Sequence, residues 1–190
     1  MVALSLELTT EDFYQFNYYT GWTASFNSRK RVIYYLKSIA YTIGLTFLII
    51  YLVDRRISPV PLVPCAIIGI IANFVIIPPR IKHHYEKQVD KFYSNPSNSN
   101  FLLKTELIID ENGIHPKDET TTTIYSWSAF VKKAETNDYF YLYLNSQLAL
   151  VIPKRIFTSP KEKIEFESLL LAHFPLQAEL NNLEKIVSAK

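Results

Sequence analysis

Two adjacent cations, Lys154 and Arg155, are the side chains of this sequence best placed to bind an anion. They follow an apolar, strand-like approach in the heptapeptide VIPKRIF, Val151 to Phe157. Pro153 cannot donate to a β-ladder, so we expect the strand to end there and the two cations to lie in the corner that follows. Such a corner is a candidate site for a phosphate group or another anion.

The residues after this corner predict a helix whose first turn would strengthen the site. Ser159 suits the N-cap, Pro160 the first helical position, and Glu162 the third position after the cap. A helix N-terminus attracts anions, and together with the two cations it could hold a phospholipid headgroup. In the alternative interpretation, the two cations pair with acids such as Glu162 or Asp118, or face solvent.

The other reactive side chains do not form a catalytic or metal-binding pattern. His83, His84 and Glu86 are close in sequence, but adjacent histidines on a helix point about 100° apart and chelate one ion poorly. Cys65, the only cysteine, lies in an apolar run, where a thiol is a poor nucleophile. The chain has four glycines and no glycine-rich phosphate loop, and no serine lies in a nucleophile elbow. We therefore expect a protein that is not an enzyme and has no catalytic residues, metal or cofactor.

Two uncharged apolar runs, Ser38–Val53 and Ile57–Pro79, dominate the first half of the chain. A helix needs about 20 apolar residues to cross a hydrocarbon core of roughly 30 Å, so the runs predict a transmembrane helical hairpin. The alternative is a pair of long buried helices in a soluble all-α core. The predicted hairpin, with a helical extension into the cytoplasm, occupies residues 29–91, with spans at about 32–53 and 59–79.

The cations at the ends of the two runs predict how the hairpin is oriented. The outer flanks hold Arg29, Lys30, Arg31, Arg80 and Lys82. The connection between the runs holds only Arg55 and Arg56. Because cytoplasmic flanks carry the excess of Lys and Arg, we expect a multi-pass protein of the cell inner (plasma) membrane with both termini in the cytoplasm. Pro78 and Pro79 are expected to mark the inner end of the second helix.

Asn73 is the one strongly polar residue inside the second run. In lipid its amide needs a partner, and the facing helix of the same hairpin is the favoured one. The alternative partner is a second copy of the chain, which would make the protein a homo-oligomer.

Residues 1–28 are predicted to belong to the soluble part of the protein. Leu4, Leu6 and Leu8 alternate with less apolar residues, which is typical of a half-buried strand. Thr9 and Asp12 then have the spacing of a capping pair at a helix start. An isolated strand is not stable, so this one must pair with strands that come after the hairpin. The prediction is one cytoplasmic domain interrupted by a membrane hairpin.

A polar linker at 92–100 leads into residues 101–175, which alternate as antiparallel strands and end in one helix. Gly113 is free to take a positive φ in a predicted turn. Tyr139, Tyr141 and Tyr143 share one strand face and alternate with Phe140, Leu142 and Leu144 on the other. We expect one of the two faces to be wet or to contact a partner. Strands closed by a C-terminal helix predict a small antiparallel β-barrel or sandwich, so the fold class is α+β with a transmembrane α-helical hairpin. Residues 176–190 carry a short heptad-like stripe and are predicted as a tail helix.

Several short motifs follow one another along the chain. A T-x-E-D-F segment near the start is followed, after the hairpin, by ENG-I, I-Y-S-W and V-I-P-K-R-x-F, which include Asn112, Gly113, Trp127 and Ile152 to Arg155. Over about residues 3–174, this order resembles the YcxB-like proteins of bacteria. The resemblance implies a pleckstrin-homology-like C-terminal domain on a two-helix anchor. It implies no particular catalytic or ligand-binding residue.

Two functions of different class fit this architecture. The first is a membrane-anchored binding module whose cytoplasmic domain docks a cytoplasmic or membrane protein, as an interaction or regulatory adaptor. The second is a small transport or channel-associated subunit in which hairpins oligomerise around Asn73. Two spans without an intramembrane charge make a poor solute pathway, which favours the first. The lipid bilayer is an expected partner, and the net charge of −2 over residues 101–175 disfavours nucleic acid.

Overall fold

The computed structural model of the chain describes residues 1–53, 62–95, 98, 104–117 and 123–173. The chain forms two compact units. One unit contains Met1–Phe16 and Val89–Lys190, and the other contains Asn17–Gln88. We call them the soluble unit and the hairpin unit. The predicted N-terminal segment 1–28 is therefore divided, since residues from Asn17 onward group with the hairpin.

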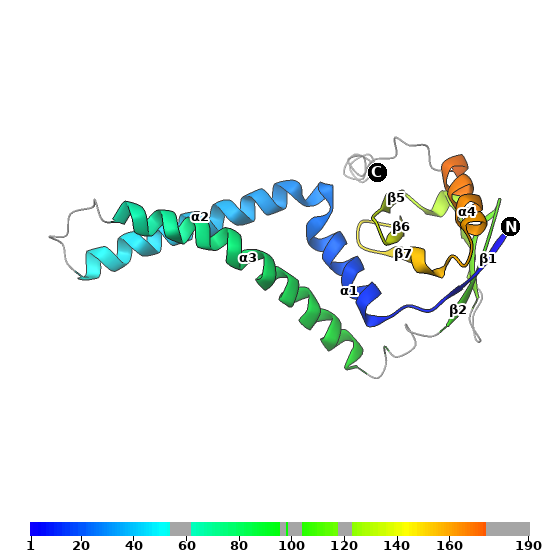
Figure 1. Ribbon diagram of the computed structural model, residues 1–190, viewed down its shortest axis with the longest axis horizontal. Helices are drawn as coiled ribbons and strands as arrows, with labels where there is room; N and C mark the ends of the chain where they lie inside the picture. Colours follow the sequence, from blue (N-terminus) through cyan, green and yellow to red (C-terminus); the bar gives the residue numbers. More distant parts are fainter. Residues whose placement is uncertain (54–61, 96–97, 99–103, 118–122, 174–190) are drawn as a thin grey trace. The chain divides into compact units, whose positions relative to one another are not determined.

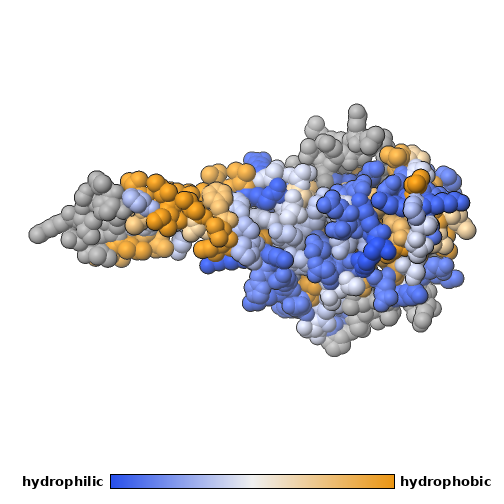
Figure 2. Space-filling model, in the orientation of Figure 1, coloured by the Kyte–Doolittle hydropathy of each residue, from blue (hydrophilic) through white to orange (hydrophobic). Residues whose placement is uncertain are grey.

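The hairpin unit is built on two long helices, α2 (Ser28–Val53) and α3 (Leu62–Tyr93), which cross each other (Figure 1) and are in contact where Asn73 of α3 meets Ser38 of α2. Segments Ser25–Ile49 and Val63–Tyr93 are long and apolar enough to cross a membrane, and almost nothing in their apolar windows is buried. Figure 2 shows hydrophobic side chains gathered over this hairpin. The buried-core alternative is therefore wrong for these helices, because a soluble core helix hides its apolar face.

Pro78 and Pro79 do not end the second helix, contrary to the sequence prediction. Both lie inside α3, which continues to Tyr93. A proline removes its own amide donor and no other, so a helix can continue where packing supports the turns beyond it. Here Ile77 is buried on one side of the prolines, and on the other the Tyr85 ring meets the Tyr18 ring edge to face, with ring centroids 5.8 Å apart.

Two antiparallel sheets form the soluble unit. The first has strand order β1-β2-β3-β4 and the second β5-β6-β7. The strands are β1 (Val2–Leu6), β2 (Thr105–Asp110), β3 (Gly113–Lys117), β4 (Tyr125–Ser126), β5 (Lys132–Glu135), β6 (Tyr139–Tyr143) and β7 (Ala149–Pro153). The α+β class is confirmed, while the strands of the described residues stay in two sheets and do not close into a barrel.

The first strand pairs across the hairpin insertion, as predicted. Val2 lies opposite Ile109 and Leu4 opposite Leu107 in an antiparallel register. The alternate residues Val2, Leu4 and Leu6 are buried, so the strand turns one apolar face to the core. The soluble unit is thus assembled from the two parts of the chain that flank the hairpin.

One hydrophobic core is shared by both sheets and by helix α4 (Pro160–His173). Leu107 and Ile109 from the first sheet meet Phe140 and Leu142 from the second in this cluster. From α4, the Phe166 ring lies edge to face with the Phe140 ring at 5.2 Å and is fully buried. Helix α4 therefore closes the core that the two sheets leave open.

Both faces of β6 are covered by the chain itself, which corrects the expectation that one of them is wet or contacts a partner. Phe140 and Leu142 on one face are buried in the core. Tyr141 and Tyr143 are buried. Phe16 of α1 (Thr10–Tyr18) packs on both rings, with ring centroids 5.6 and 6.2 Å away. The alternating pattern of β6 could not reveal this, because the covering helix comes from the other side of the hairpin.

The turn between β2 and β3 requires the residue types found there. Gly113 has φ 154°, and a Cβ there would lie 2.1 Å from the backbone oxygen of Tyr125. The Asp110 carboxylate accepts from the amides of Asn112 at 2.8 Å and Gly113 at 3.2 Å. The Trp127 indole donates to the Asp110 backbone oxygen at 2.9 Å. Only glycine fits this position, and the indole fastens the turn to the next segment.

Candidate functional site

Arg155 and Asp12 meet in a buried polar cluster that joins the start of the chain to its last strand. Arg155 lies in the 3-10 turn η5 (Lys154–Ile156) that follows β7, and Asp12 lies in the first turn of α1. The two guanidinium Nη atoms donate to the two Asp12 carboxylate oxygens, each at 2.5 Å. Nη2 also donates to the backbone oxygen of Glu7 at 3.3 Å. The result is a bidentate ion pair of the kind that holds arginine in one geometry.

Asp12 is the centre of this cluster, and its carboxylate is 1% exposed. The Thr9 amide and hydroxyl donate to it at 2.7 and 2.9 Å, and the Tyr139 hydroxyl donates at 3.0 Å. The Asp12 amide in turn donates to the Thr9 hydroxyl at 3.3 Å, which completes the predicted capping pair. One carboxylate therefore caps α1, binds Arg155 and holds β6.

These contacts decide how the groups of the cluster ionise. Burial raises the pKa of Asp12, but hydrogen bonds from Arg155, Thr9 and Tyr139 outweigh it and hold the pKa below the usual 3.8. Burial and the Asp12 carboxylate raise the pKa of Tyr139 to about 12. The hydrogen bond to Asp12 raises the pKa of Arg155. Asp12 and Arg155 are thus a stable charged pair at neutral pH.

Lys154, the other cation of the predicted anion corner, also has a carboxylate partner in the chain. Its ammonium lies 2.6 Å from a Glu135 oxygen, and the same ammonium lies 4.7 Å from the centre of the Phe140 ring. Its amide donates to the backbone oxygen of Asp138 at 2.7 Å. Pairing of the two cations with acids, as in the alternative interpretation, is thus present through Glu135 and Asp12. Of the two acids named there, Glu162 has another role and Asp118 lies outside the described residues.

Glu162 caps helix α4, as its spacing predicted. One of its carboxylate oxygens accepts from the Thr158 amide at 2.9 Å and the Ser159 amide at 3.3 Å. The Glu162 amide donates to the Ser159 hydroxyl at 3.3 Å, which makes the capping box reciprocal. This first turn therefore already carries a carboxylate of its own. The binding of an anion at Lys154 and Arg155 stays a prediction.

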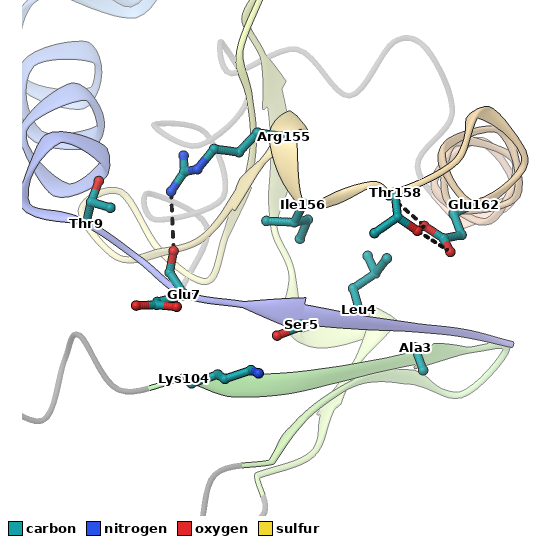
Figure 3. A pocket seen from close by; sticks show the side chains of 10 residues that line it. All are labelled: Ala3, Leu4, Ser5, Glu7, Thr9, Lys104, Arg155, Ile156, Thr158 and Glu162. Carbon is teal, nitrogen blue, oxygen red and sulfur yellow. Dashed lines mark hydrogen bonds between the residues drawn. The ribbon is translucent and has the colours of Figure 1, made fainter.

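A cleft of about 650 Å³ runs from Arg155 to the first turn of α4, along strand β1 (Figure 3). Its walls combine apolar Leu4 and Ile156 with the hydroxyls of Ser5 and Thr158. Lys104, just before β2, contributes an exposed ammonium for which the described residues show no bonded partner. The cleft has the size and mixed lining of a ligand site.

Comparison with known families gives a match in the part of the chain that contains Arg155 and Tyr139. Residues 109–170 match the family model of the YcxB-like proteins. This part of the chain is similar to that family. No protein in the curated set of known proteins matches the chain. The resemblance stated from the sequence is thereby confirmed for a segment that includes Gly113, Trp127 and Arg155.

The YcxB-like segment supplies only one side of the buried cluster. Arg155 and Tyr139 lie inside it, whereas Asp12 and Thr9 lie before the hairpin, outside the matched residues. The arginine of the V-I-P-K-R-x-F motif thus has a defined role: it fastens the YcxB-like segment to the beginning of the chain.

Asn73 makes its polar contacts inside the hairpin. Its side-chain oxygen accepts from the Ser38 hydroxyl at 2.6 Å. Its amide nitrogen donates to the Thr42 hydroxyl at 2.9 Å and to the backbone oxygen of Gly69 at 2.8 Å. Both amide groups are used by α2 and α3 of the same chain.

The cations at the ends of the hairpin fall into two groups. Arg31 donates to the backbone oxygens of Trp22 at 2.5 Å and Ala24 at 2.8 Å, and Lys30 donates to that of Gly21 at 3.2 Å. These two side chains cap the turn before α2. The other three predicted flanking cations are exposed and show no bonded partner among the described residues: Arg29, Arg80 and Lys82.

The described residues hold no cluster of three or more acidic, histidine or cysteine side chains that could bind a metal. His83 pairs with Glu86 at 3.4 Å and His84 contacts Gln88 at 2.8 Å, each along the exposed surface of α3. Cys65 is an exposed free thiol on α3.

Sequence reasoning missed Asp12 as the partner of Arg155 and Tyr139 as a donor to Asp12, and it missed Lys104 and the cleft. Asp12 was recognised only as a local cap. The sequence nevertheless held an indication of the pair, because Asp12 lies in the first and Arg155 in the last of the motifs that carry the family resemblance. Lys104 had no signal, because its position beside β1 depends on the pairing of β1 with β2.

Proposed function

We propose that this chain is a two-span protein of the cell inner membrane with both termini in the cytoplasm. The exposed apolar surfaces of α2 and α3 support insertion into a bilayer. Arg29, Arg80 and Lys82, which flank the predicted apolar runs, support the orientation, because cytoplasmic flanks carry the excess of cations.

Cysteine labelling tests this topology. In a Cys65→Ser background, Arg56→Cys should react with a membrane-impermeant maleimide added to intact spheroplasts. Lys82→Cys should react only after the membrane is opened, and it serves as the matched control. Labelling of residue 56 from the inside alone would contradict the proposed orientation.

We further propose that the soluble unit, with the pleckstrin-homology-like character that the family resemblance implies, is a binding module and that the protein acts as an adaptor rather than an enzyme. The cleft along β1 is the observation that carries this proposal. Its lining offers hydroxyls, a free ammonium and apolar surface, which suit recognition. Arg155, which lines the cleft, and its neighbour Lys154 each pair with a carboxylate of the chain and so contribute to structure.

Photo-crosslinking in living cells tests the binding role. A photoreactive amino acid in place of Ser5, which lines the cleft, should give a discrete adduct with one protein partner. The same replacement at Ile164, 65% exposed on α4 and outside the cleft, should not give this adduct. Identical adducts at both positions would contradict a role of the cleft in binding.

The channel-associated alternative has less support. It relied on Asn73 as a contact between copies, and Asn73 instead has both amide groups bonded within its own hairpin. Under the adaptor proposal, Asn73→Leu should leave the Ser5 adduct unchanged.

A further inference from the structure

Strand β1 is the edge of its sheet. Its hydrogen-bonded neighbour is β2, and no strand of the described residues pairs with its other side. An edge strand presents a row of main-chain amides and carbonyls that no ladder uses. In a soluble protein such an edge is a hazard unless something occupies or protects it.

The cleft follows the edge of β1 rather than one of its faces. Ala3, Leu4 and Ser5 all line it. Successive side chains of a strand point to opposite faces, so a cleft that touches three consecutive residues must lie along the strand edge. The core face is closed, since Leu4 is 3% exposed. Figure 3 shows β1 running along the cleft, between the Lys104 end of β2 and the turn that carries Ile156.

At one end of this edge, a side chain of the protein itself already occupies a main-chain acceptor. Arg155 donates to the Glu7 backbone oxygen at 3.3 Å, just beyond the last residue of β1. The main chain before Glu7 is the part that a guest segment would meet. Arg155 therefore marks where the guest strand ends.

The charges at the Arg155 end favour an acidic guest. Lys104 has no bonded partner among the described residues, and Arg155 presents about half of its side chain to solvent. The Glu7 carboxylate is the only acidic group of the lining at this end, because Glu162 caps α4 at the other end of the cleft. Asp12 lies behind the guanidinium and is 1% exposed. A carboxylate on the guest would meet two cations here.

We propose that the β1 cleft binds an extended acidic peptide segment of a partner protein, which adds to the sheet as a strand next to β1. Main-chain pairing supplies the contact, and a guest carboxylate near Lys104 and Arg155 fixes the register. The proposal rests on the proposed function, since it names the partner chemistry of the same cleft. The full 650 Å³ accommodates a short extended segment and not a folded domain.

Selection of peptides on the full-length chain in lipid nanodiscs tests this inference. A displayed library of random nonapeptides should yield segments that are acidic and alternate in polarity. Their affinity should fall at least about tenfold on Lys104→Glu, because a fixed charge contact is then reversed. Lys161→Glu makes the same change on the exposed first turn of α4, outside the cleft lining, and should leave the affinity unchanged.

N-methylation of the best peptide tests strand addition directly. Only every second amide of an added strand faces β1, so methylation should abolish binding at alternate positions and spare those between. A flat response, or a loss confined to the acidic residue, would overturn the strand model. Failure to select any peptide, or selection that ignores Lys104→Glu, would overturn the inference as a whole. Neither result would affect a partner adduct at Ser5, so failure of the inference remains distinguishable from failure of the proposed function.

Discussion

The Arg155 guanidinium and the Asp12 carboxylate form a bidentate ion pair across 143 residues of sequence. Asp12 begins the helix that leads toward the hairpin, and Arg155 follows the last strand of the YcxB-like segment. Strand β1 and strand β2 make a second link between the same two regions. The ion pair is thus the polar part of the junction between the two parts of the chain that flank the hairpin in sequence.

Arg155→Met should destabilise the soluble unit. The substitution leaves Asp12 charged and buried with only neutral donors, so we expect a loss of about 2 to 4 kcal/mol in the free energy of unfolding. This is at or below the usual range for breaking a buried pair, because the guanidinium is half exposed. Denaturant unfolding followed by Trp127 fluorescence, in a Trp22→Phe background, would measure it.

Lys154→Met is the matched control for that experiment. It removes the neighbouring cation, whose partner Glu135 is 52% exposed. The Lys154 side chain is itself 17% exposed, but its removal leaves unpaired only the exposed Glu135 carboxylate, which water can solvate. The loss should therefore stay below about 1 kcal/mol. Equal losses for the two substitutions would contradict a special role for Arg155.

Acid should weaken the same junction. Because the pKa of Asp12 is held below 3.8 in the folded protein, its ionised form stabilises the fold above that pH, and this contribution is lost as pH falls through the lower, folded pKa. Hydrogen bonds from the Asn112 amide and the Thr158 amide lower the pKa of Asp110 and Glu162, so they act in the same direction.

Comparison with Asp12→Asn isolates the contribution of Asp12 from those of the other two acids. The wild-type chain should be more stable at pH 6, and the difference should shrink as the pH is lowered to 3. A difference that stays constant over this range would show that Asp12 stabilises the fold without its charge. The free energy of unfolding at several pH values is the measurement.

Lys132 should make stability rise with pH as Asp12 does, but in an alkaline window. Its side chain is 2% exposed, with the ammonium 5.2 Å from the centre of the Tyr143 ring, and burial lowers its pKa to about 8 from 10.5. The unfolded chain therefore binds more protons between these values, so stability gains from this residue as pH rises from 8 toward 10.5. Lys132→Met should be more stable than the wild type at pH 7, and its advantage should diminish toward pH 10 in thermal unfolding. An advantage that grows with pH would contradict the lowered pKa.

Local sequence patterns predicted the elements better than their partners. The alternation of Leu4 and Leu6 and the Ser159 to Glu162 cap depend on neighbours in sequence, and both are confirmed. The Asp12–Arg155 pair and the packing of Phe16 on Tyr141 each join a residue before the hairpin to a residue after it. The local pattern of a single strand or helix does not determine where the chain lies after the hairpin. Contacts between the segments before and after it could therefore be found only in the structure.

The same distinction applies to the proline pair of α3. Two prolines in succession are a strong local stop signal, yet the helix passes through them. The packing of the turns on either side outweighs the local preference, as tertiary contacts commonly do for helix propensity.

Gly69 should be intolerant of larger side chains, because α2 and α3 approach closely there. A Cβ at Gly69 would lie 2.8 Å from the Thr42 methyl carbon, whereas a Cβ at Gly44 would have no neighbour within 4 Å. Small residues permit such close approach of membrane helices, so Gly69→Val should separate them locally and Gly44→Val should not. The two substitutions change helix propensity alike, which makes Gly44 the matched control.

The spacing of the two helices can be measured at Tyr35 and Phe74, whose rings stack at 5.2 Å across the hairpin. Cysteines at these two positions, in a Cys65→Ser background, report that spacing through crosslinking with a short bifunctional thiol reagent. Gly69→Val should lower the crosslinking yield several-fold, and an equal yield in both variants would contradict the close contact at Thr42.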